Sequence, residues 1–113
     1  MKYFYTLRID CDEKDIDLIS KILKKEPNSI CGWAYEVEVS SYEKDFDFIL
    51  EFTRILAGKE AQLSLLGISP DDISFWMIYE YDDQCNMEFD PDQLKIMGSK
   101  GYRLCISCYQ ADD

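Results

Sequence analysis

The fold of this chain is decided by the segment Ile73–Tyr81, which has the sequence ISFWMIYEY. Successive side chains of a strand point to opposite faces, so this segment would divide its side chains into two sets. One set includes Phe75 and Met77. The other set includes Trp76 and Ile78. Because both sets are apolar, the sequence predicts a central strand here.

Alternation of apolar and polar residues predicts further strands on either side of this segment. Residues 3–9 and Trp33–Ser40 alternate with a period of two, which is typical of half-buried strands. The polar residues 82–84 would turn the chain into a short strand at residues 85–89, so that a hairpin follows the central strand. Residues 102–109 provide the last strand.

Helices are predicted between these strands, where apolar residues recur at helical spacing. Asp10 has the chemistry of an N-cap, and the helix that it would open ends at Pro27, because the residue before a proline avoids the α region. Ser41 would cap a second helix, followed by another helical turn or two. Asp90 would cap the last helix, with Gln93 completing a capping box.

The resulting order of elements is β-α-β-α-β-β-α-β. A chain of 113 residues fits one compact domain over residues 1–113, and a hydrophobic content of 47% is sufficient for a core. Strands and helices in this order favour one mainly antiparallel sheet of about five strands, with helices packed on one face. The predicted fold class is therefore α+β.

The charge balance restricts the partners that this chain can bind. The sequence has 12 basic and 23 acidic residues, which gives a formal net charge of −11. Such a surface repels phosphate backbones and anionic membranes, so we expect no nucleic acid and no membrane partner, whereas a basic protein would be attracted. The first residues lack the apolar core of a signal peptide, which predicts a cytoplasmic protein.

The residue types also restrict the chemistry. The chain has no histidine, which is the commonest general base and zinc ligand, and its five glycines form no nucleotide-binding loop. Cys105 and Cys108 are spaced as a C-x-x-C motif, but three positions apart in a strand they would point to opposite faces. The acids in residues 82–92 lack the glycine and the spacing of a calcium loop. We therefore expect no catalytic residue, no metal and no cofactor.

One face of the predicted sheet is a candidate binding site. If the helices cover the face that carries Tyr5, Leu7 and Met77, the opposite face presents aromatic residues surrounded by acids. Aromatic anchors with a charged rim are typical of protein-binding sites. The predicted protein-binding residues are Phe4, Glu36, Glu38, Trp76, Glu88 and Tyr109. The alternative is that a loop or a second copy of the chain covers this face.

Distinctive short segments occur along nearly the whole chain. Residues 7–9 read LRI in the first strand, and residues 32–33 read GW at the start of the second. Residues 89–98 read FDPDQLKIMG, and residues 104–109 read LCISCY. Together these segments resemble a family of small bacterial domains, the domain of unknown function 4279 family. The resemblance implies an α+β fold and a bacterial cytoplasmic setting, and the family carries no established activity to transfer.

These observations support hypotheses from different functional classes. The first is a non-enzymatic protein-interaction domain, an immunity-like inhibitor that binds a basic toxin through the acid-rimmed face, with Trp76 and Tyr109 as anchors. The second is a small-ligand-binding or regulatory domain, or a carboxylate-based enzyme, which would need a concave pocket with convergent polar groups. A homodimer formed through the same face is a third hypothesis.

Overall fold

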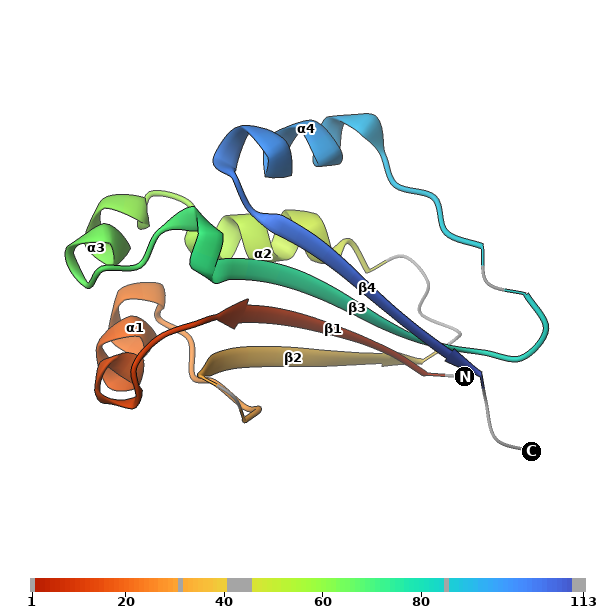
Figure 1. Ribbon diagram of the computed structural model, residues 1–113, viewed down its shortest axis with the longest axis horizontal. Coiled ribbons are helices and arrows are strands. Elements are labelled where there is room, and N and C mark those ends of the chain that lie inside the picture. The colour runs from red at the N-terminus through yellow and green to blue at the C-terminus, as the bar shows by residue number, and fades with distance from the viewer. Residues whose placement is uncertain (1, 31, 41–45, 85, 111–113) are drawn as a thin grey trace.

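The computed structural model describes residues 2–30, 32–40, 46–84 and 86–110. Within these residues the fold is α+β, with a four-stranded sheet and helices packed against one of its faces (Figure 1). The strands are β1 (Lys2–Ile9), β2 (Trp33–Ser40), β3 (Ile73–Tyr81) and β4 (Arg103–Gln110), and their order in the sheet is β2-β1-β3-β4. The prediction of a central strand at Ile73–Tyr81 is confirmed, because β1 and β4 pair with β3 on either side.

The sheet differs from the prediction in strand number and strand direction. Strand β1 pairs antiparallel with β2 and with β3, but β4 pairs parallel with β3, so the sheet is mixed. Residues 86–89, which belong to the predicted hairpin strand, lie outside any strand. The predicted number of about five strands is therefore too high, and the sheet has one parallel pair beside two antiparallel pairs.

Both edges of β3 are occupied along most of its length, which explains why residues 86–89 form no hairpin strand. Strand β1 pairs with β3 from Ile73 to Tyr79, and β4 pairs with it from Ser74 to Tyr81. A hairpin strand directly after β3 would need one of these two edges. The chain instead returns through α4 (Pro91–Lys100) before it enters β4, which is the strand–helix–strand connection that parallel neighbours require.

Along the chain, the other helices come between the first three strands. They are α1 (Ile16–Leu23), preceded by a 3-10 turn at Glu13–Asp15, and α2 (Phe48–Leu56) and α3 (Glu60–Leu65), with a second 3-10 turn at Pro70–Asp72 before β3. Figure 1 shows α1 and α3 at one end of the sheet, whereas α2 and α4 lie along it.

The ends of the helices agree with the sequence in part. Asp90 caps α4 as predicted, because its carboxylate accepts a hydrogen bond from the backbone N–H of Asp92 at 2.8 Å. Helix α1 ends earlier than the predicted stop at Pro27, because Lys24 adopts a left-handed conformation with φ of 55°. Asp10 pairs with Arg8 at 3.2 Å, and the N-cap position of the following turn belongs to Asp12. The predicted cap Ser41 lies outside the described residues.

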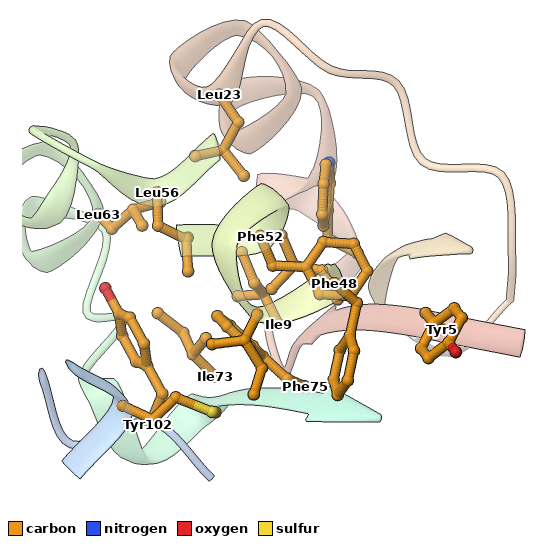
Figure 2. Close-up of a cluster of buried hydrophobic side chains, with 14 of the residues drawn as sticks. Tyr5, Ile9, Leu23, Phe48, Phe52, Leu56, Leu63, Ile73, Phe75 and Tyr102 are labelled. Atoms are coloured by element: carbon orange, nitrogen blue, oxygen red, sulfur yellow. The ribbon is translucent and has the colours of Figure 1, made fainter. Parts of the chain in front are cut away.

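The core lies between the helices and one face of the sheet (Figure 2). A series of aromatic contacts runs through it, with ring centroids 4.7 Å apart for Tyr5–Phe48, 6.1 Å for Phe48–Phe52, 5.4 Å for Phe52–Phe75 and 5.5 Å for Phe75–Tyr102. Such ring pairs contribute about 0.5–1.5 kcal/mol each beyond the burial of their area. They connect β1, α2, β3 and Tyr102, the residue just before β4, in one cluster.

One buried polar contact joins α1 to β2. Trp33 is fully buried, and its indole N–H donates a hydrogen bond to the hydroxyl oxygen of Ser20 at 3.1 Å. The Ser20 hydroxyl in turn donates to the backbone oxygen of Ile16 at 3.0 Å. Both polar groups are thereby satisfied inside the core, where an unpaired N–H would be costly.

Candidate functional site

The sheet face opposite the helices carries most of the predicted binding residues. The register pairs Phe4 of β1 with Glu38 of β2 and with Ile78 of β3, and it pairs Glu80 with Tyr109. Paired residues of neighbouring strands lie on the same face of a sheet. This face, called the open face below, includes Phe4, Thr6, Arg8, Glu36, Glu38, Trp76, Ile78, Glu80, Arg103, Cys105 and Tyr109.

Among the described residues no helix covers the open face, because the buried side chains of the strands point the other way. The buried residues of β1 are Tyr5, Leu7 and Ile9, and the residues that alternate with them are half-buried. The aromatic rings of Phe4 and Trp76 are likewise half-buried. The open face therefore offers apolar surface without being part of the core.

The polar atoms of its two largest anchors are already bonded within the sheet. The indole N–H of Trp76 donates to the hydroxyl oxygen of Ser74 at 2.9 Å. The hydroxyl of Tyr109 donates to a carboxylate oxygen of Glu80 at 3.4 Å, and the Tyr109 side chain is 44% exposed. These bonds hold the rings in place, so an incoming partner would contact ring surface that is oriented in advance.

Asn28, in the loop before β2, is bonded to the backbone of Glu36 on the open face. The side-chain amide of Asn28 donates to the backbone oxygen of Glu36 at 2.9 Å, and the backbone N–H of Glu36 donates to the Asn28 amide oxygen at 2.6 Å. Asn28 thus bonds the outer edge of β2 as a neighbouring strand would, and this protects that edge from another chain. The remaining edge of the sheet belongs to β4.

One predicted residue of the open face lies elsewhere. Glu88 belongs to the segment between β3 and α4, which forms no strand, so the alternation that placed it on the open face does not apply. It lines a cleft with Tyr3 and Tyr79, whose β1 and β3 positions face the helices. The prediction of Glu88 as a member of the same surface as Phe4 and Trp76 is therefore wrong.

The cleft containing Glu88 has a volume of about 460 Å³. It lies where the first residues of β1, the last residues of β3, the start of α2 and the segment before α4 meet. Its lining residues are Tyr3, Tyr5, Phe46, Asp47, Phe48, Met77, Tyr79, Asn86, Met87, Glu88, Phe89 and Gln93. A volume of this size is within the range of pockets that hold small molecules.

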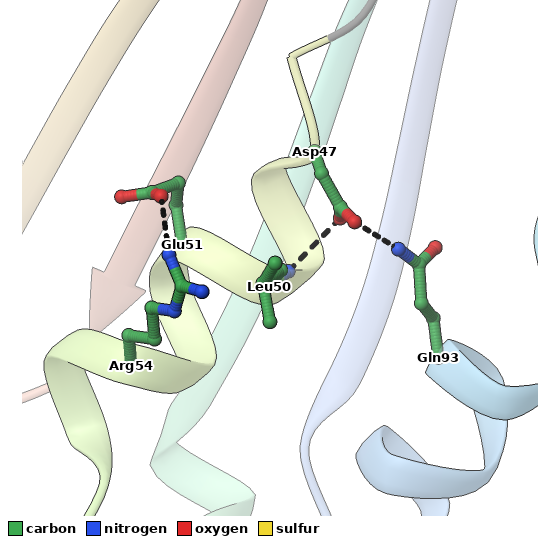
Figure 3. Close-up of polar contacts among 5 residues, drawn as sticks. All are labelled: Asp47, Leu50, Glu51, Arg54 and Gln93. Carbon is green, nitrogen blue, oxygen red and sulfur yellow. Dashed lines mark hydrogen bonds and ion pairs between the residues drawn. The ribbon is translucent and has the colours of Figure 1, made fainter.

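Asp47 lines the cleft, and Figure 3 shows its hydrogen bonds to Leu50 and Gln93. One of its carboxylate oxygens accepts a hydrogen bond from the backbone N–H of Leu50 at 3.0 Å, which caps α2. The other oxygen accepts a hydrogen bond from the side-chain amide of Gln93 on α4. Gln93 was predicted to complete a capping box, and its amide instead connects α4 to α2.

Tyr5 is a buried tyrosine in the lining of the cleft. Burial raises the pKa of Tyr5, and the neighbouring Tyr3 raises it further. The Tyr5 phenol therefore stays protonated and neutral at ordinary pH. It can provide ring surface and a hydrogen-bond donor, and it cannot act as a base.

The described parts of the chain contain no cysteine pair placed for redox chemistry and no metal site. Cys105 is paired with Trp76 on the open face, whereas Cys108 is paired with Tyr79 on the opposite face, as the strand pattern predicted. Cys11 is also a free thiol. No group of three or more His, Cys, Asp or Glu side chains within residues 2–30, 32–40, 46–84 and 86–110 could hold a metal ion.

A second hollow, of about 350 Å³, is lined by acids near the start of α1. Two of these acids have structural partners, because Asp72 accepts a hydrogen bond from the backbone N–H of Ser69 at 2.9 Å and Asp10 pairs with Arg8. Burial raises the pKa of Cys11 beside them, and the nearby aspartates add to the rise, so its thiol stays protonated. The described residues that line this hollow therefore have no arrangement suited to a nucleophile.

In comparisons with known proteins, no family model matches the chain, and no curated protein or solved structure matches it. The resemblance to the domain of unknown function 4279 family therefore stays a prediction. None of the helices in the described residues is long and apolar enough to cross a membrane.

The sequence did not predict the cleft. Its walls come from four separate parts of the chain, and no single segment contains enough of them to form a motif. One local signal was present, because Asp47 directly precedes an apolar helical run and an aspartate in that place is a typical N-cap.

Proposed function

We propose that this chain is a non-catalytic protein-interaction domain that binds a basic protein through the open face, as an immunity-like inhibitor of a toxin in the bacterial cytoplasm. The observation that carries the proposal is the open face itself. It combines half-buried aromatic rings, Phe4 and Trp76, with the neighbouring acids Glu36 and Glu38, and no described helix covers it.

The charge of the chain supports a basic partner. A formal net charge of −11 creates a negative potential that speeds the encounter with a positively charged protein. Trp76 and Phe4 would then supply the apolar centre of the interface, since buried aromatic residues contribute most of the binding energy in such complexes. Glu36 and Glu38 would form a rim that favours basic side chains.

The first test is to mix the purified chain with a basic protein encoded beside it in the genome and to measure binding by calorimetry as salt is raised. We expect binding at low ionic strength and weaker binding at about 0.3 M salt, because screening shortens the range of the charges. Absence of binding at low salt would contradict the proposal.

Two matched variant pairs locate the interface. Glu36→Gln with Glu38→Gln and the control Glu13→Gln with Asp17→Asn both reduce the formal charge from −11 to −9, so they alter the overall potential equally. Only the first pair lies on the open face, and it is expected to weaken binding by at least about ten-fold more than the control. Equal effects would place the interface elsewhere.

An apolar pair gives an independent check. Trp76→Ala removes the central ring of the open face and is expected to weaken binding about thirty-fold, which is typical of an interface anchor. Leu65→Ala removes an apolar side chain that is 88% exposed on α3, and it should leave binding unchanged. If the chain instead forms a homodimer through the open face, Trp76→Ala will convert the dimer to a monomer in sedimentation experiments.

The hypothesis of a small-ligand-binding or regulatory domain is favoured by a different observation. The cleft on the other face of the sheet has a volume of about 460 Å³ and combines aromatic with polar lining residues. This second candidate function does not depend on the open face, and its ligand class follows from the lining.

A further inference from the structure

The lining of the cleft has an unusual composition. Among the described residues that line it, six are aromatic, two are acidic, and none is lysine or arginine. The acids are Asp47 at the start of α2 and Glu88 in the segment before α4. A site of this composition disfavours anions, because it places negative charge and ring faces where an anion would sit.

The rings are close enough to act together. The centroids of Tyr3 and Tyr79 are 4.8 Å apart, and those of Tyr5 are 4.7 Å from Phe48 and 5.4 Å from Phe46. These rings come from β1, β3 and the start of α2, so they line the cleft from more than one side. The negative face of an aromatic ring attracts a cation, and Tyr and Phe rings in such groups bind quaternary ammonium ions.

The carboxylates add a fixed charge to this environment. Asp47 is held by the Leu50 backbone N–H and by the Gln93 amide, so its position in the cleft is set before a ligand arrives (Figure 3). A carboxylate has about four acceptor positions, so these two bonds leave Asp47 able to attract a cation. Glu88 is exposed and can approach a ligand from the solvent side.

We propose that the cleft binds an organic cation, an alkylammonium group with an apolar stem. The positive head would lie against the rings of Tyr3 and Tyr79 and near Asp47 and Glu88, while the stem would contact the apolar remainder of the lining, which includes Met77. The volume of about 460 Å³ exceeds that of a bare trimethylammonium head and leaves room for the stem. This site is independent of the open face.

The decisive experiment compares a cation with its neutral shape equivalent. Choline and 3,3-dimethyl-1-butanol have nearly the same shape, and only choline is charged. Calorimetric titration of the purified chain is expected to show choline binding about ten-fold more tightly than the alcohol. Equal binding of the two compounds, or no binding of choline at tens of millimolar, would overturn the proposal.

Charge variants test whether the cleft is the site. Glu88→Gln removes one charge at an exposed position and should weaken choline binding several-fold without affecting the fold. Asp47→Asn also removes one charge while keeping an oxygen that can cap α2, and it should have a similar effect. Glu51→Gln removes the same charge from α2 outside the cleft and serves as the control. An equal effect of Glu51→Gln and Glu88→Gln would overturn the assignment.

A ring variant separates cation binding from simple apolar burial. Tyr3→Leu keeps an apolar side chain but removes one ring face, so choline should bind about five-fold more weakly while the alcohol binds as before. Circular dichroism of the unliganded variant establishes that the fold is retained. A parallel loss of choline and alcohol binding would contradict a cation-specific site.

The same chemistry could come from a free amine or from a lysine side chain of a basic protein. Short peptides with lysine or trimethyl-lysine distinguish the sources: tighter binding of a peptide than of choline indicates a protein side chain, and the reverse indicates a free amine. Either result supports a cation site, whereas a lysine-to-norleucine peptide that binds equally well would refute it. Trp76→Ala, on the open face, must leave choline binding intact, so the two proposals can fail separately.

Discussion

Replacing Tyr102 with phenylalanine is expected to stabilise the fold and to reduce its loss of stability at alkaline pH. The Tyr102 side chain is 7% exposed, and its ring lies 5.5 Å from that of Phe75. Its hydroxyl is buried and has no hydrogen-bond partner among the described residues. Burial, with a smaller contribution from the charge of Glu60, raises the pKa of Tyr102 to about 12.

The magnitude follows from these two properties. An unpaired buried hydroxyl costs about 1–3 kcal/mol, so its removal should increase the free energy of unfolding by about 1 kcal/mol and the melting temperature by about 4 °C. Below about pH 10 the phenol is protonated in the folded and in the unfolded chain, and its ionisation has no effect. Between pH 10 and the folded pKa of about 12, only the unfolded chain ionises, so stability falls as pH rises, by about 3 kcal/mol in total.

The assay is urea unfolding of the wild type and Tyr102→Phe at about pH 8 and about pH 11. The variant should be more stable at both values, and its advantage should grow at the higher pH, because it has no phenol to ionise at this position. Tyr81→Phe, at the half-buried end of β3, controls for the loss of one phenol. A variant that is less stable at about pH 8, or an advantage that stays constant, would refute the reasoning.

Three further substitutions test how the fold is held. Ser20→Ala removes the acceptor of the buried Trp33 indole N–H and should reduce the free energy of unfolding by about 1–3 kcal/mol, measured by urea unfolding. Gly32→Ala should be more costly than the control Gly58→Ala, because both residues have positive φ, 74° and 76°, but only at Gly32 would the new methyl group lie 2.9 Å from a backbone oxygen of β1. Asp90→Ala removes the N-cap of α4 and should lower stability by about 1 kcal/mol, whereas Asp90→Asn should not.

The elements that the sequence predicted well are those specified by neighbouring residues. The alternation at Ile73–Tyr81 identifies both the strand and its central place, because apolar residues on both faces are typical of a strand with a neighbouring strand on each side. Asp90 before Pro91 specifies the start of α4 for the same local reason, since cap and first helical position are adjacent.

The elements that it predicted poorly depend on distant parts of the chain. Residues 85–89 contain apolar residues at alternate positions, and this favours a short strand when they are considered alone. Whether such a segment pairs depends on a free strand edge, and β4 holds that edge of β3 along Ser74–Tyr81. A local pattern cannot reveal that competitor, so the direction of β4 was missed together with the hairpin.

The same distinction explains which site residues were placed correctly. Phe4, Glu36, Glu38, Trp76 and Tyr109 belong to strands, where a period of two assigns each residue to a face. Glu88 was assigned by extending that period into a segment that is not a strand. The cleft that contains it joins residues from Tyr3 to Gln93, so only the folded chain brings its walls together.

Both proposals rest on one property of the sequence, an excess of acids beside aromatic residues. The salt dependence of binding distinguishes the two sites. A protein partner on the open face would be steered by the charge of the whole chain, −11, over a range set by the Debye length, which is about 10 Å at 0.1 M and shrinks as salt is raised. Its association rate should therefore fall steeply as salt is raised.

A cation in the cleft would instead contact Tyr3, Tyr79 and Asp47 directly, and direct contacts are screened much less. Stopped-flow association of the basic partner and calorimetry of choline, measured over the same salt series, should consequently give a steep and a shallow dependence. Equally steep curves would mean that choline only condenses on an acidic surface, and the cleft would then have no special role.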